Sequence, residues 1–143
     1  MIDYLNSRVI LSIAAVAITG MVMFASISSN AEISRYCTEQ AAEEISRLIK
    51  IASMVDCSYF ESRFPLDRSV FGSDIMVHLN ASWVSVENNG YKSIRVFDAP
   101  VQVDGIGYGE TCALAYAGYV IVIIATSSLM EKRNHVTIRI EMA

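Results

Sequence analysis

The chain has 143 residues, a net charge of −4 and a charged fraction of only 18%. This length leaves room for one modest domain beside a long apolar segment. The negative balance, without any run of Lys or Arg, argues against a nucleic-acid partner, because nucleic-acid binding normally needs a basic patch.

An uncharged apolar run without proline occupies residues 9–27, with the sequence VILSIAAVAITGMVMFASI. About twenty such residues, each adding 1.5 Å to a helix, cross a bilayer core of roughly 30 Å. The run therefore predicts a membrane helix, which would make the protein single-pass with an exported C-terminal domain. A cleaved secretory signal is disfavoured, because the apolar core of such a signal is normally only about 7–15 residues long.

A second helical pattern follows in residues 30–56, where apolar residues recur at intervals of three and four. This spacing is typical of one buried face of an amphipathic helix. The predicted face comprises Ile33, Cys37, Ala41, Ile45, Leu48, Ala52 and Val55, and Tyr36 and Ile49 widen it. Because no proline interrupts residues 4–56, we expect the helix to continue from the apolar run into this segment.

The chain then becomes strand-like. Residues 58–74 contain a proline, a glycine and mixed polarity, which predicts a loop. Alternating polarity in residues 75–83 predicts a half-buried strand that bulges or breaks near its end. The sequence Asn-Asn-Gly at 88–90 predicts a tight hairpin turn, with a returning strand over 94–96. A short strand is expected at 101–103.

Residues 113–130 are uncharged and allow two interpretations, a buried strand or a second membrane span. The β-branched residues within 119–124 favour the strand. Residues 136–142 alternate strictly between apolar and polar, and their nearest partner is 120–125. Residues 131–134 then form the predicted turn between these two strands.

The apolar run, the amphipathic stripe and the β-rich remainder together resemble the type IV pilin-like proteins, particularly the archaeal pilins and archaellins. The resemblance implies an α+β fold, in which a long N-terminal helix packs on a C-terminal antiparallel sheet or sandwich. It divides the chain into a membrane or filament-core helix (1–29), its amphipathic continuation (30–57) and a β-rich head (58–143). It also implies a place in the membrane, then at the cell surface or in a filament once assembled.

In function, the resemblance implies a structural subunit or minor subunit of an extracellular filament. Its partners would be copies of itself or related subunits, bound through the N-terminal helix, with membrane lipid as the partner before assembly. Small residues allow helices to approach closely. The residues expected to form the assembly helix are Val9, Ile13, Ala14, Ala17, Gly20 and Phe24.

Residues 1–8, MIDYLNSR, lack the Gly or Ala processing site that precedes the apolar run in pilin precursors. The alternative is therefore an unprocessed, single-pass, membrane-anchored accessory whose exported β domain binds an envelope or motor component.

The sequence predicts neither an enzyme nor a cofactor, metal or small-molecule substrate. No nucleophile lies in a recognisable motif, and His78 and His135 have no accompanying ligand cluster. Asn80 opens an Asn-Ala-Ser sequon and is the candidate for glycosylation. Cys112 can bond to a helix cysteine, with Cys57 as the candidate partner, and three unbonded thiols are the alternative.

Overall fold

The structure is a computed structural model that describes residues 2–127 and 133–143, with side chains described for 18–23, 30–127 and 133–143. The contacts divide the chain into two units, residues 1–33 and 34–143. The described residues form two helices and eight strands: α1 (Ile2–Met54), β1 (Tyr59–Pro65), α2 (Arg68–Phe71), β2 (Met76–Leu79), β3 (Trp83–Asn88), β4 (Tyr91–Val96), β5 (Gln102–Val103), β6 (Ala113–Tyr116), β7 (Tyr119–Ser127) and β8 (Asn134–Met142).

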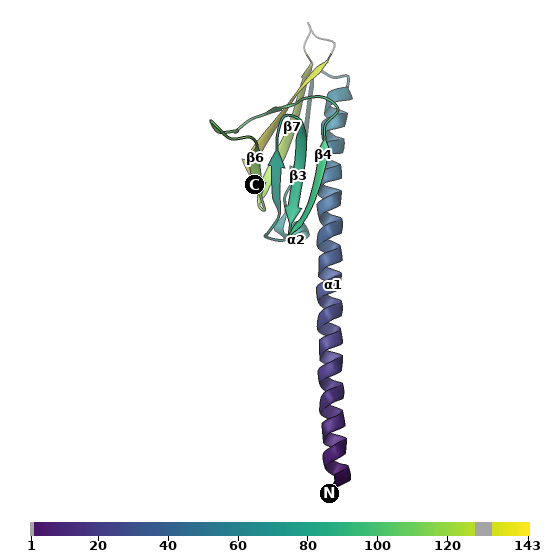
Figure 1. Ribbon diagram of the computed structural model, residues 1–143. Coiled ribbons are helices and arrows are strands. Elements are labelled where there is room, and N and C mark those ends of the chain that lie inside the picture. Colours follow the sequence, from purple (N-terminus) through teal and green to yellow (C-terminus); the bar gives the residue numbers. More distant parts are fainter. Residues whose placement is uncertain (1, 128–132) are drawn as a thin grey trace. The chain divides into compact units, whose positions relative to one another are not determined.

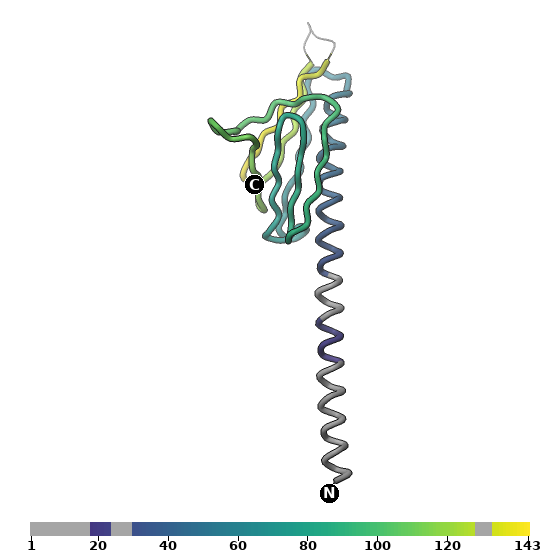
Figure 2. The backbone as a smooth tube through the Cα atoms, viewed as in Figure 1, coloured from purple at the N-terminus to yellow at the C-terminus, as the bar shows by residue number. Residues whose placement is uncertain are grey.

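The strands of the larger unit form two four-stranded sheets (Figure 1), and the path of the backbone through them is traced in Figure 2. Sheet A has the order β1-β7-β8-β5, and sheet B has the order β4-β3-β2-β6. Neighbouring strands are antiparallel except for β5 and β8, which pair in parallel. The strands therefore do not form the wholly antiparallel head that the sequence predicted.

Part of α1 belongs to the larger unit and buries one face in its core. The core-facing residues of the helix are Ala41, Ala42, Ile45, Ile49 and Ala52, each at most 3% exposed. Three of the five are alanines, which let a helix approach its neighbours closely. The predicted stripe is confirmed at Ala41, Ile45, Ile49 and Ala52 but is wrong at Ile33 and Tyr36, which are exposed.

The inner faces of both sheets share this core with the helix. Their buried residues alternate along the strands, as expected where one face of a strand is covered. Sheet B contributes Val77, Leu79, Val84, Val86 and Ala115, and sheet A contributes Ile121, Ile123, Ala125, Val136 and Ile138. The larger unit is therefore held by a single apolar core that joins one helix to two sheets.

The predicted hairpin is confirmed. Its two-residue loop is formed by Asn89 and Gly90, with φ values of 49° and 81°, between the paired strands β3 and β4. Positive φ at both central residues is what a tight hairpin turn requires. The predicted strand break is also found, because β2 ends at Leu79 and β3 begins at Trp83.

The segment 113–127 forms two strands, so a second membrane span there is wrong. β6 belongs to sheet B and β7 to sheet A, and Gly118 lies in the turn between them with a φ of 89°. The Gly118 N–H donates to the carbonyl of Leu66, which fixes the turn.

β8 pairs with β7 over its whole length, as predicted. Of the predicted turn at 131–134, residues 131 and 132 lie outside the described residues, and Asn134 is the first residue of β8.

The loop predicted for residues 58–74 is wrong. Residues 59–65 form β1, whose Phe60, Ser62 and Phe64 face inward and alternate with exposed residues. The outward Glu61 and Arg63 gave the segment the mixed polarity that concealed this alternation. α2 follows directly and is capped by Asp67, whose carboxylate accepts the N–H of Ser69.

The predicted fold class and location are also wrong. In the larger unit the strands of the two sheets contain more residues than the helices, so the described architecture is mainly β, with one long helix contributing a face to the core. Among the helices of the described residues, none is long and apolar enough to cross a membrane. The physical reason is visible in residues 30–54, where Glu32, Arg35 and Glu39 add charges at intervals of about one turn. The single-pass membrane anchor is therefore not supported.

Candidate functional site

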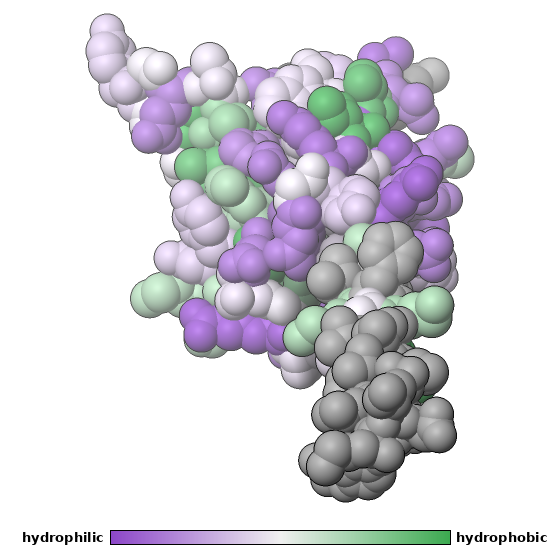
Figure 3. Space-filling view, turned by 60° about the horizontal axis from the view of Figure 1, so that its bottom comes forward, coloured by the Kyte–Doolittle hydropathy of each residue, from purple (hydrophilic) through white to green (hydrophobic). Residues whose placement is uncertain are grey.

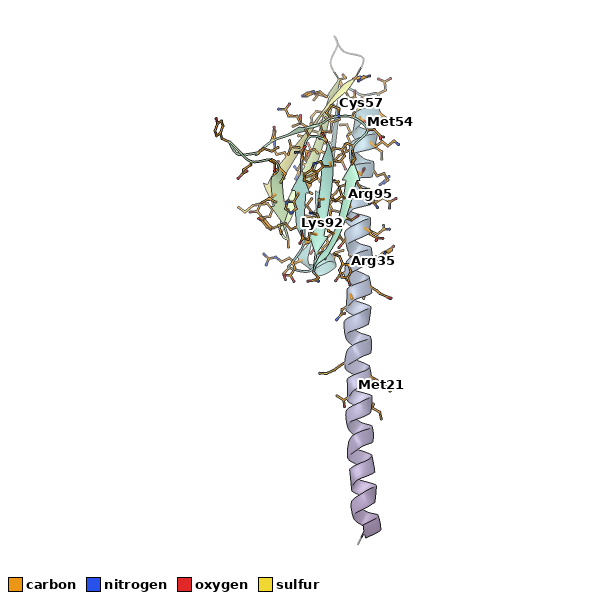
Figure 4. All side chains as sticks on the ribbon, viewed as in Figure 1. Met21, Arg35, Met54, Cys57, Lys92 and Arg95 are labelled. Carbon is orange, nitrogen blue, oxygen red and sulfur yellow. The ribbon has the colours of Figure 1, made fainter. Side chains whose placement is uncertain are left out.

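The most conspicuous surface feature is an apolar turn of α1, defined here as residues 18–23 (Figure 4 labels Met21 within it). Its large side chains are 60–73% exposed: Ile18, Met21, Val22 and Met23. A helix turns fully every 3.6 residues, so these four side chains spread over about 200° of its circumference, and Gly20 lies in the remaining sector. Contiguous apolar surface of this kind marks an interaction site in soluble proteins.

Gly20 gives this apolar turn an open side. A Cβ built on Gly20 has no heavy atom within 4 Å beyond the helix's own backbone. A larger residue would therefore fit here in the single chain, whereas a closely packed neighbouring helix would exclude it. Of the predicted assembly residues, Gly20 lies on this described surface. Val9, Ile13, Ala14, Ala17 and Phe24 lie where the side chains are outside the description.

The outer face of sheet A carries a network of ion pairs instead. Arg63 contacts Glu61 at 2.9 Å and Glu141 at 3.7 Å, and Arg139 contacts Asp104 at 3.7 Å. Val122 on β7 lies between its cross-strand neighbours Arg63 on β1 and Arg139 on β8. Val122 is only 1% exposed, because the stems of long charged side chains can cover apolar surface. The charged outer face of sheet A is therefore suited to contact with water.

Hydrogen bonds within this network shift the pKa values of its members. The Tyr59 hydroxyl, 2.6 Å away, and then Arg63 donate to Glu61 and lower the pKa of its carboxyl group. The same bond to Glu61 raises the pKa of Tyr59. These groups are open to solvent, so they tune the charge of the surface and add little to stability.

The outer face of sheet B is more apolar. Its two edge strands expose Ile94 and Val96 on β4 and Leu114 and Tyr116 on β6, each 42–71% exposed. Figure 4 labels Lys92 and Arg95 on the same β4 edge, where charged residues discourage unwanted strand pairing. Elsewhere hydrophilic residues predominate, as the face shown in Figure 3 illustrates.

The three cysteines are free thiols. The Cys57 thiol, just beyond the end of α1 (Figure 4), donates to the carbonyl of Tyr59 at 3.2 Å. The Cys112 sulfur lies 3.7 Å from Nδ1 of His78. The structure thus places the predicted disulfide partners Cys57 and Cys112 in separate environments.

The sequon residue Asn80 lies in the turn between β2 and β3. Its side-chain nitrogen donates to the carbonyl of Thr111, and its side-chain oxygen accepts the N–H of Ser82 at 3.1 Å. Both ends of the amide are therefore engaged in fixing the turn against the neighbouring loop. Glycosylation of Asn80 stays a prediction.

A hollow of about 170 Å³ lies between α1, the segment after β4 and the start of β8. Lys50 and Asp98 line it and form an exposed ion pair at 3.7 Å. Pockets for small molecules are usually larger, about 300–1,000 Å³. Among the described residues there is also no group of three or more His, Cys, Asp or Glu side chains that could hold a metal ion.

Sequence reasoning missed the approach of Cys112 to His78. The two residues are 34 positions apart, and they meet only because β6 pairs with β2. The alternation in 75–83 placed His78 on an outward face, but nothing in the sequence identified its neighbour.

Comparisons of the chain with protein-family models, with curated proteins and with solved structures find no match.

Proposed function

We propose that the protein is a structural subunit or minor subunit of a type IV pilin-like filament, and that its copies associate through the N-terminal part of α1. One observation carries this proposal: the apolar turn at residues 18–23 exposes four large hydrophobic side chains. Farther along, the same helix contributes to a complete apolar core. Among the described residues of the helix, Ile18, Met21, Val22 and Met23 are therefore large apolar side chains that lie outside that core.

A second copy of the same segment is a fitting occupant. The turn contains no charged residue, so two copies meet without burying an unpaired charge. Gly20 gives a facing helix room to approach. The charged outer face of sheet A is suited to remain in water while the helices associate.

The free energy of association favours contact of each chain with several neighbouring chains over contact with one. Full burial of a large apolar side chain is worth about 1.5–3 kcal/mol, so four side chains exposed by about two thirds gain about 4–8 kcal/mol. Association costs about 4–15 kcal/mol in lost translation and rotation. A single contact of this turn therefore only about offsets the cost. Contacts with several neighbours, as in a filament, give net stability.

The proposal is tested by placing a charge on the apolar turn of the full-length chain. In Val22→Lys, a lysine replaces a side chain that is 60% exposed, and lysine is a good helix former, so the single chain should fold unchanged. The matched control is Val70→Lys on α2, because Val70 is also 60% exposed. Sedimentation velocity and negative-stain microscopy then measure particle size and shape.

We expect the unmodified chain and Val70→Lys to form large elongated particles and Val22→Lys to sediment as a single chain. If Val22→Lys assembles as the unmodified chain does, the proposed contact is wrong. A monomeric unmodified chain at every accessible concentration would contradict the proposal as well.

A further inference from the structure

Three polar residues lie near one another on the outer face of sheet B. His78 on β2 is directly opposite Ser85 on β3. On the other side of β2, Leu114 is directly opposite His78, and Cys112, two residues before Leu114, lies diagonally across from His78. Residues at alternate positions of a strand share a face, and cross-strand neighbours lie within contact distance. The pairing thus brings Cys112, His78 and Ser85 together.

Two buried polar atoms of these three residues have no hydrogen-bond partner, namely Nε2 of His78 and Oγ of Ser85. Ser85 is only 2% exposed. Unsatisfied buried polar atoms are uncommon and costly, so each calls for an explanation. Here both belong to residues that face each other across one strand pair.

The two unpaired atoms are explained if His78 at times carries a proton from Cys112. Nδ1 of His78 is 3.7 Å from the Cys112 sulfur and is the atom placed to accept that proton. Once charged, the imidazolium ring donates from Nε2, and the hydroxyl oxygen of Ser85 on the facing strand is an available acceptor. A nucleophilic sulfur, a base and a group that orients the base form the arrangement that activates a thiol.

We propose that Cys112 is a reactive thiol, activated by His78 and positioned through Ser85, that exchanges with small neutral disulfides. The Cys112 proton passes to Nδ1 of His78, and the sulfur attacks one sulfur of the disulfide. A new S–S bond forms to Cys112 while the old one breaks, and the released half leaves as a thiolate with the bonding electron pair. One disulfide replaces another, so no external oxidant is needed.

The chain contains its own controls. Cys37, Cys57 and Cys112 are all half-buried, so differences in access do not separate them. The Cys57 thiol donates to the carbonyl of Tyr59, an acceptor that cannot take its proton. Cys112 has a base as its neighbour instead.

The expected effect follows from the ionisation of thiols. A free thiol is only a few per cent ionised at neutral pH, so complete proton transfer raises its rate by at most about thirtyfold. A stabilised thiolate is intrinsically less nucleophilic, which leaves a net gain of at most about three- to fourfold. Cys112 should therefore react about three times faster than Cys57.

The experiment treats the full-length chain at neutral pH with 4,4′-dithiodipyridine, a neutral disulfide whose released thiopyridone is followed by absorbance. Mass spectrometry of peptides from quenched samples assigns a rate to each cysteine. We expect His78→Asn, which removes the base but keeps a polar side chain, to lower the Cys112 rate to that of Cys57. The rates of Cys37 and Cys57 should stay unchanged, which shows that the variant is folded.

The proposal is overturned if Cys112 reacts no faster than Cys57, or if folded His78→Asn keeps the fast rate. If His78→Asn also raises the rates of Cys37 and Cys57, that variant is unfolded and Ser85→Ala decides. Ser85→Ala removes an oxygen that has no partner, so the fold should persist. A Cys112 rate that falls toward the rate of Cys57 then supports the positioning role; an unchanged rate overturns it. These outcomes do not depend on whether the chain forms filaments.

Discussion

The core of the larger unit predicts a large effect of shortening one helix side chain. Ile45 on α1 is fully buried among residues from the helix and both sheets. Ile45→Ala removes three carbon groups, each worth about 0.8 kcal/mol on transfer from water. The cavity left behind adds to this loss, and alanine's better helix propensity returns about 0.4 kcal/mol. We expect the free energy of unfolding to fall by about 3 kcal/mol.

A matched control lies on the same helix. Ile51 is 38% exposed, so Ile51→Ala loses part of the transfer energy and leaves no closed cavity. Its cost should stay below about 1 kcal/mol. Equilibrium urea unfolding measures both variants, with the single tryptophan, Trp83 on β3, as the fluorescent probe. All samples need the same protein concentration, because association changes apparent stability.

Trp83 reports on sheet B, whereas far-ultraviolet circular dichroism at 222 nm reports mainly on the helix. If helix and sheets share one core, both signals should shift to lower urea together in Ile45→Ala. Equal costs for Ile45→Ala and Ile51→Ala would refute the packing. A Trp83 transition that stays in place while the helix signal shifts would also refute it.

Three further predictions concern the end of the helix, the surface and the unit boundary. Asn134→Ala should cost about 1–3 kcal/mol in urea unfolding, because its side chain donates to the carbonyls of Ala52 and Val55 at the end of α1. The pKa of Glu61 is lowered from its ordinary value of 4.5, so its stabilisation is complete above that pH and is lost as pH falls through the lowered folded value. Because Glu61 is open to solvent, Glu61→Gln should weaken this loss of stability only slightly as pH falls below about 4.5, and a steeper fall of the urea midpoint than in the unmodified chain would contradict this. A fragment comprising residues 34–143 should unfold cooperatively as a monomer, because the whole core cluster lies within it; calorimetry and sedimentation measure this.

Local patterns predicted those parts of the fold in which neighbours along the chain pair with each other. The strict alternation of β8 identified that strand and its partner β7, and Asn89-Gly90 identified the hairpin. β1 was missed because Glu61 and Arg63 alternate with Phe60 and Phe64, so the segment has no apolar run. Its pairing with β7 depends on residues far along the chain.

Features that arise from long-range contacts could not be predicted. Ile33 continued the helical stripe in sequence, but the buried face of α1 begins at Thr38. The meeting of His78 with Cys112 requires β6 to add to the far edge of sheet B, which no local signal specifies. The apolar run was interpreted as a membrane span from its length and its lack of charge, and no helix of the described residues is long and apolar enough to cross a membrane.

The central claim is that copies of the chain associate through the first part of α1, and proximity of residue 21 between copies tests it most directly. Met21 is 73% exposed, and packed helices lie about 8–10 Å apart, within the range of pyrene excimer formation. The three cysteines are replaced by serine, and pyrene is attached at Met21→Cys or, in a control chain, at Val70→Cys. The account predicts strong excimer fluorescence in sedimenting particles from the chain labelled at position 21 and little from the control. Assembled particles with excimer fluorescence at position 70 but none at position 21 would contradict it.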